Sequence, residues 1–204
     1  MNHSIPADGS VSRRADKRYI ALACGLALHS AWVCSAMYSM SMFGTVINFA
    51  GVHGTSFSLL YIVSSVGFFL TALVACAIEQ RLLQYARSRV HMRTAALVTC
   101  LATLLSLVPH IGPEWLSMAV EVFAGLATGV GSAILMLYWG VALAREDERR
   151  SVLAAAAAVA AGFGLNALVL QSLPGLLGGL VAAILPFGEF ALLAYVSPHQ
   201  GDPV

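Results

Sequence analysis

The chain has 204 residues, of which 59% are hydrophobic and 10% are charged, and its net charge is +1. Ordinary soluble domains carry roughly 25% charged residues, so much of this chain needs lipid as its solvent. A nearly neutral chain provides no field that attracts nucleic acid. The composition predicts a multi-pass protein of the inner (cytoplasmic) membrane, with the lipid bilayer as its partner and no direct nucleic-acid binding.

The chain begins with a polar segment, residues 1–17, which predicts a disordered cytoplasmic tail. Six apolar segments follow, and a span needs about 20 mostly apolar residues. The predicted spans cover residues 18–43, 55–78, 92–108, 115–144, 151–173 and 176–196. We expect an external turn-rich loop at 44–54, an interfacial turn or short amphipathic helix at 79–93, and a cytoplasmic tail at 197–204. The predicted fold class is an all-α, polytopic membrane helical bundle.

The topology follows from the basic residues. All eleven Lys and Arg lie before or at the start of the first span, between spans two and three or at the start of the third, or between spans four and five. Short cytoplasmic loops retain Lys and Arg. The sequence therefore predicts that both termini are cytoplasmic.

The fourth span carries an unusual helix face. At about 100° per residue, one carboxylate and several small or hydroxyl side chains fall within roughly a quarter-circle. These residues are Glu121, Gly125, Thr128, Gly129, Ser132, Met136 and Trp139. The pair Gly125 and Gly129 favours close packing against another helix of the same chain. The face is predicted to look into the bundle.

Ionisable groups at membrane depth are costly and are candidates for function. The spans contain three: His29, Glu121 and Glu189, with Glu189 expected nearer the cytoplasmic interface. Asn166 matches Glu121 in depth, so the two side chains are able to meet. Alternatively, Glu121 only fixes helix register and His29 only bonds a neighbouring hydroxyl. The candidate ligand-binding residues are Glu121, Thr128, Ser132, Trp139, His29, Trp32 and Asn166.

No metal or catalytic motif is visible in the sequence. The four cysteines lie in apolar spans without a CxxC pair or a His at metal-ligand spacing, and they are expected to be buried thiols. No nucleophile stands beside a base, and no phosphate-binding loop occurs. We therefore expect no enzyme activity, no metal and no cofactor.

Two segments carry a family resemblance. Residues 129–140 read GVGSAILMLYWG, with Ala142 and Ala144 beyond them, and residues 25–33 read GLALHSAWV. They resemble the fourth and first spans of the membrane-embedded LuxR-type transcriptional regulators of certain actinobacteria, in which a major-facilitator-like sensor of twelve spans precedes a cytoplasmic helix-turn-helix domain. The resemblance implies a sensor in signal transduction and transcription regulation, with a small ligand between spans 1, 4 and 5.

The chain departs from that family in three ways. Val141 follows the Trp-Gly pair, where the family often has an acidic residue, and the Gly-x-x-x-Asp-Arg-x-Gly loop is absent between spans two and three. The 204 residues hold six predicted spans and no carboxy-terminal DNA-binding helices. We therefore expect a major-facilitator-like half-bundle: a truncated regulator, a split product, or a six-span relative, acting as a homodimer or with a second six-span half.

Three functions remain open from the sequence. The first is a sensor-like ligand-binding domain whose DNA-binding output lies outside this chain. The second is a six-span transporter or half-transporter that acts as a dimer. The third is a structural membrane protein without a ligand.

Overall fold

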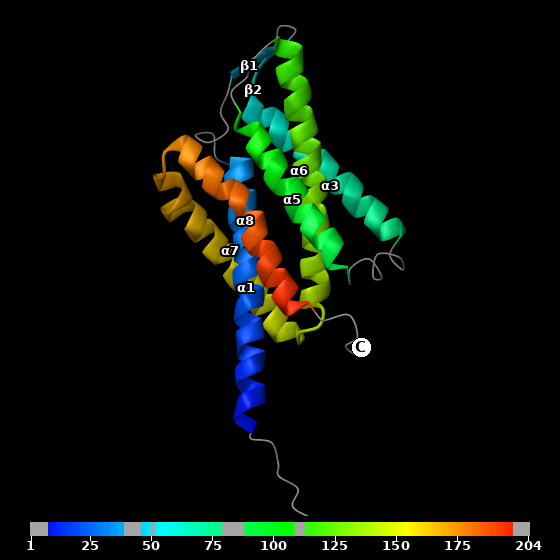
Figure 1. Cartoon of the computed structure of the whole chain (residues 1–204), viewed down its shortest axis with the longest axis vertical. Coiled ribbons are helices and arrows are strands. Elements are labelled where there is room, and N and C mark those ends of the chain that lie inside the picture. The colour runs from blue at the N-terminus through cyan, green and yellow to red at the C-terminus, as the bar shows by residue number, and fades with distance from the viewer. Residues whose placement is uncertain (1–7, 39–45, 50–51, 79–87, 109–112, 198–204) are drawn as a thin grey trace, which may run out of the picture.

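The computed structural model describes residues 8–38, 46–49, 52–78, 88–108 and 113–197. Its long helices run alternately up and down, so the start of α1 and the end of α8 lie at the same end of the bundle (Figure 1). They are α1 (Asp8–Tyr38), α3 (Ser56–Ala77), α5 (Arg89–Ser106), α6 (Glu114–Leu143), α7 (Glu148–Leu168) and α8 (Gly175–Val196). A short 3-10 helix, η1 (Leu170–Ser172), precedes the turn into α8.

Five of these helices are long and apolar enough to cross a membrane: α1, through Asp16–Ala36, and α3, α6, α7 and α8. Their outward faces carry large apolar side chains, most densely on α3. The exposed residues there include Ile62, Phe69, Leu70, Leu73 and Val74. Soluble monomers rarely expose contiguous apolar patches of such extent. The chain is a helical bundle of the multi-pass membrane type.

Helix α5 corresponds to the predicted third span, 92–108, and is not among these five. Its first turns carry Arg89, His91 and Arg93, and its 18 residues reach only about 27 Å. It nevertheless lies inside the bundle and packs against α6 and α8. Met92, Ala96 and Thr99 are among the residues that it buries.

Two predictions about the first third of the chain need correction. Helix α1 begins at Asp8, so residues 8–17 are helical and not a disordered tail. A helix that has formed extends at little cost through good helix formers such as Arg, Ala and Lys. The predicted loop at 44–54 contains an antiparallel hairpin, β1 (Val46–Phe49) and β2 (Val52–Thr55), with Asn48 opposite His53. β-branched and aromatic residues in both segments favour this pairing.

Some predictions fall on residues that the structure does not describe, and the prediction about the cysteines is confirmed only in part. The predictions outside the described residues concern the first part of the amino-terminal tail, the end of the first span, the interfacial turn or amphipathic helix, and the carboxy-terminal tail, at residues 1–7, 39–43, 79–87 and 198–204. All four cysteines are free, as expected, but only Cys34 and Cys100 are buried. Cys24 and Cys76 are exposed, because the helix faces that carry them are turned away from the core.

Glycines allow the closest helix crossings. A Cβ at Gly129 would overlap the carbonyl oxygen of Ser64 and lie 2.8 Å from the backbone nitrogen of Phe68. A Cβ at Gly125 would lie 3.0 Å from Val63. Helix α6 therefore approaches the backbone of α3 closely, which confirms the predicted packing of this glycine pair within the chain.

The helix pairs repeat a pattern. α3 packs on α6 as α7 packs on α1, and α5 packs on α6 as α8 packs on α1, while α5 and α8 pack on each other. Exchanging the first three long helices for the last three leaves this pattern unchanged. Since α1 ascends and α6 descends in Figure 1, the two halves are inverted relative to each other. α1 and α6 themselves touch little.

Candidate functional site

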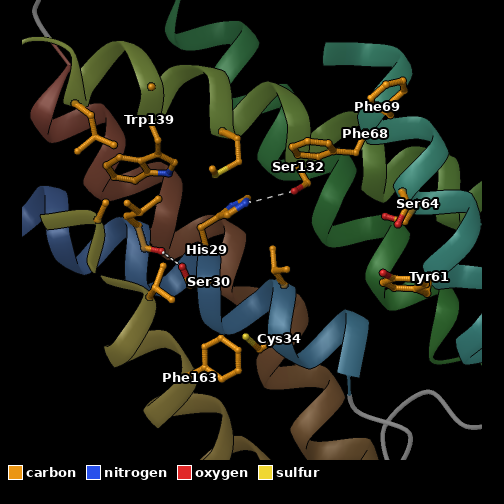
Figure 2. Close-up of a pocket in the computed structure, with 18 residues that line it drawn as sticks. His29, Ser30, Cys34, Tyr61, Ser64, Phe68, Phe69, Ser132, Trp139 and Phe163 are labelled. Atoms are coloured by element: carbon orange, nitrogen blue, oxygen red, sulfur yellow. Dashed lines mark hydrogen bonds between the residues drawn. The ribbon is translucent and has the colours of Figure 1, made fainter. Parts of the chain in front are cut away.

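A cavity of about 670 Å³ lies between α1, α3, α6 and α7 (Figure 2). Small-molecule sites in proteins typically enclose about 300–1,000 Å³. α1 and α6 supply the buried polar wall at His29 and Ser132, α3 supplies aromatic side chains and the hydroxyls of Ser64 and Ser65, and α7 supplies apolar side chains. Its lining includes His29, Cys34, Tyr61, Phe68, Phe69, Ser132, Met136, Trp139, Gly140 and Phe163.

The cavity is open on one side. Tyr61 and Phe69 of α3 and Phe163 of α7 all line it, yet they are 43%, 64% and 54% exposed. Because α3 packs on α6 and α7 packs on α1, the rim of the cavity runs along the seam between these two helix pairs. A molecule is able to enter there without a rearrangement of the helices.

A buried polar chain forms one wall of the cavity. The Oγ of Ser132 lies 3.4 Å from Nε2 of His29, whose ring points toward that hydroxyl in Figure 2. The opposite ring nitrogen, Nδ1, lies 3.0 Å and 3.1 Å from the two carboxyl oxygens of Glu189. Nε1–H of Trp139 donates to Glu189 at 2.6 Å. The chain joins α1, α6 and α8.

Burial constrains the charge of the His29–Glu189 pair. The two side chains are 4% and 0% exposed. An uncompensated charge in such a medium is costly, so the pair is stable only when it is neutral as a whole. Two neutral forms leave no carboxyl hydrogen without an acceptor: either His29 is protonated and Glu189 ionised, or Glu189 keeps its proton and donates it to Nδ1. In both forms Nε2 of His29 carries a hydrogen and donates toward Ser132 and the cavity.

Ser132, His29 and Glu189 follow the order of a catalytic triad, in which a serine contacts a histidine and the histidine contacts a carboxyl group. Ser132 and His29 are 103 positions apart in sequence, so no local motif revealed their contact. Ser132 lies in the middle of α6, where the neighbouring backbone N–H groups are bonded within the helix. Those groups are not available as oxyanion donors, which acyl transfer requires.

Three of the residues predicted from the sequence line the cavity: His29, Ser132 and Trp139. Thr128 is buried one turn from Ser132 and donates to the hydroxyl of Ser64, 3.3 Å away on α3. It does not line the cavity, but it positions Ser64, which does.

The remaining predicted residues are buried outside the lining. Nε1–H of Trp32 donates to Thr103 at 3.1 Å and so ties α1 to α5. Asn166 accepts from the hydroxyl of Ser35 at 2.8 Å, which joins α7 to α1. Glu121 is 2% exposed, and its contact with Asn166 stays a prediction, as does a ligand role for any of these residues.

The sequence singled out Glu189 as an ionisable residue but did not reveal its partner, and it did not reveal the contribution of α3. The structure buries Glu189 fully against His29. The sequence contained one signal of this contact. His29 lies about three helical turns from Arg18, and Glu189 lies within three turns of Val196, so both are within about three turns of the same end of the bundle. The α3 residues Tyr61, Phe68 and Phe69 gave no such signal, because aromatic side chains are common on faces toward lipid.

Within the described ranges, no group of three His, Cys, Asp or Glu side chains is placed to hold a metal ion. Comparisons with protein-family models, with curated proteins and with solved structures found no match to the chain. The family resemblance therefore rests on the residues of spans one and four alone.

Replacement of Glu189 tests the polar chain. Glu189→Leu leaves the N–H of Trp139 and Nδ1 of His29 without their partner, and each buried unsatisfied group costs roughly 1–3 kcal/mol. We expect a loss of roughly 2–4 kcal/mol of unfolding free energy. Glu189→Gln retains an acceptor for Trp139 and a donor for His29, so most of the stability should remain. Unfolding of the purified protein in lipid nanodiscs measures both.

The matched control is Ile184→Leu, on the same helix at a side chain that is 61% exposed. It should unfold like the wild type. If Glu189→Leu is also as stable as the wild type, the polar chain does not hold these helices together.

Proposed function

We propose that the chain is a sensor-like membrane domain that binds a small ligand in the cavity between α1, α3, α6 and α7. The observation that carries this proposal is the cavity itself, which has a ligand-sized volume and a buried polar wall at His29 and Ser132. Three of its four helices are the spans 1, 4 and 5 for which the family resemblance implies a ligand. The regulatory output lies outside this chain.

A sensor must respond to occupancy, and the packing supports such a response. α1 and α6 touch little across the cavity, whereas α1 packs on α7 and α8, and α6 packs on α3 and α5. A ligand that contacts both His29 and Met136 therefore bridges two groups of helices. Ligand binding shifts a conformational equilibrium when it favours one arrangement of those groups over another.

The bundle is proposed to be a major-facilitator-like half with six spans, α5 being the third. The inverted packing of its two groups of three helices supports this, because such inverted repeats occur within each half of major-facilitator transporters. The helix ends that carry the basic residues also lie together at one end of the bundle. Arg18 lies 3.7 Å from Glu146, and Arg89 donates to the carbonyl oxygen of Ala194 at 3.3 Å. By the positive-inside rule this end is cytoplasmic, with both termini.

Reporter fusions test this topology. Fusions after Ala50, Gly112 and Gly175 should report the outside of the inner membrane, and fusions after Arg149 and Val204 the cytoplasm. A cytoplasmic signal at Gly112 would remove α5 as a span and invert every later helix.

Filling the cavity tests ligand binding. Gly140 lines it, and a Cβ at this position meets nothing within 4 Å, so Gly140→Leu should fold and reduce the free volume. Gly164 is equally open but does not line the cavity, and Gly164→Leu is the matched control. Compounds found by thermal stabilisation of the wild type should stabilise Gly164→Leu but not Gly140→Leu. Saturation at 100 times Kd should add about 2.7 kcal/mol. Equal stabilisation of both variants would contradict binding in this cavity.

A half-transporter that acts as a homodimer is the second candidate, since an open cavity lined by helices of both inverted repeats also suits a transporter. Mass measurement after cross-linking in membranes distinguishes a dimer from a monomer. The neighbouring genes distinguish the outputs: a downstream helix-turn-helix reading frame favours the sensor, and a solute-binding or metabolic gene favours transport. A structural protein is the remaining alternative if no compound binds.

A further inference from the structure

The lining of the cavity restricts the charge of its ligand. It consists mainly of aliphatic and aromatic side chains, and among the described lining residues none is Lys, Arg, Asp or Glu. An ion that enters such a site loses its water and gains no opposite charge in contact. The pair that His29 of the wall forms with the buried Glu189 behind it is neutral as a whole. The cavity therefore disfavours ionised ligands.

The polar atoms of the wall restrict its hydrogen bonding. The hydroxyl of Ser30 is used within α1, where it donates to the carbonyl oxygen of Leu26 at 3.0 Å. The hydroxyl of Ser64 is engaged with that of Thr128, 3.3 Å away. Nε2 of His29 is different, because its one contact at the wall, with Ser132, is long at 3.4 Å. Its hydrogen is present in both neutral forms of the pair and is available to a better acceptor.

The aromatic rim restricts the shape of the ligand. Tyr61, Phe68 and Phe69 of α3 lie across the cavity from Phe163 of α7 (Figure 2). Aromatic side chains bind ring systems through offset-stacked or edge-to-face contacts. Their exposed faces belong to helices with apolar outer surfaces, so a molecule dissolved in the bilayer reaches them directly.

We infer that the cavity takes an uncharged, largely apolar molecule with one hydrogen-bond acceptor, such as a ketone or ester oxygen, which accepts from Nε2–H of His29. This inference rests on the proposed ligand-binding function and names its ligand class. Glu189 is then a positioning residue, because it holds Nδ1 and directs Nε2 toward the cavity. Ser132 stabilises the empty site and gives up its weak contact to the ligand.

Three small probes with similar rings test the acceptor and the charge of the ligand separately. Benzophenone is uncharged and has one carbonyl, diphenylmethane lacks the acceptor, and 4-benzoylbenzoate adds a negative charge. Their binding is measured by equilibrium dialysis against the full chain in lipid nanodiscs, with empty nanodiscs subtracted for partition into lipid. Irradiation of bound benzophenone, followed by peptide mass spectrometry, locates the site.

We expect saturable binding of benzophenone, about 3–10-fold tighter than that of diphenylmethane, which is the range of one net hydrogen bond. The anion should bind more weakly than either. Cross-links should fall on cavity-lining residues such as Met136. The preference for benzophenone should disappear in His29→Phe and persist in His91→Phe, the same change at an exposed histidine of α5 outside the cavity lining. The comparison of probes on the wild type holds even if His29→Phe does not fold.

Equal affinity for benzophenone and diphenylmethane, tighter binding of the anion, or cross-links outside the cavity would overturn this ligand class. If Gly140→Leu still abolishes stabilisation by other compounds, the cavity remains a binding site and only the inferred ligand class is wrong. Absence of saturable binding by all three probes would also overturn the class. If Gly140→Leu then alters the binding of no compound at all, the proposed function fails as well.

Discussion

The buried contact between His29 and Glu189 is the interaction on which the rest of the structure depends. It joins α1 to α8 at a depth where neither residue is stable as a lone ion. Trp139 donates to the same carboxyl group, and Ser132 lies against the other ring nitrogen, so α6 is held to the pair at two points. One carboxyl group thus fixes three helices and gives the cavity its hydrogen-bond donor.

Close packing elsewhere leaves the space that this donor faces. Gly125 and Gly129 bring α6 onto α3, and Gly162 brings α7 onto α1, where a Cβ would lie 2.8 Å from the carbonyl oxygen of Ala27. Each of these crossings draws two helices together within one side of the bundle. α1 and α6 are left apart, and the cavity occupies the seam between them. Small residues at the crossings and a polar pair at the wall are therefore parts of one arrangement.

The sequence predicted much of this fold because its signals were local. Hydropathy gave helix positions close to those observed, and the glycine pair in the fourth span predicted a tight crossing. The inward face of that span was also anticipated, and of its members only Met136 is substantially exposed, on the open side of the cavity. The hairpin at 46–55 was missed because its short strands stand among turn-forming residues.

The candidate site was only partly predictable, because its contacts join distant segments. His29, Ser132 and Trp139 were identified as polar or aromatic groups inside apolar spans, which is a property of each residue alone. Glu189 has the same property, but its partner is 160 positions away, and no spacing rule connects them. Glu121 met every local criterion equally well, and the structure places it outside the cavity lining.

The protonation of His29 in the bilayer tests the account most directly. Solid-state NMR of the protein labelled with ¹⁵N-histidine reports whether each ring nitrogen carries a hydrogen, and comparison with His29→Phe assigns the signal among the six histidines. The account predicts that Nε2 of His29 carries a hydrogen near neutral pH and that Nδ1 is hydrogen-bonded to Glu189. A bare Nε2, which would leave the cavity wall without this hydrogen-bond donor, would contradict it.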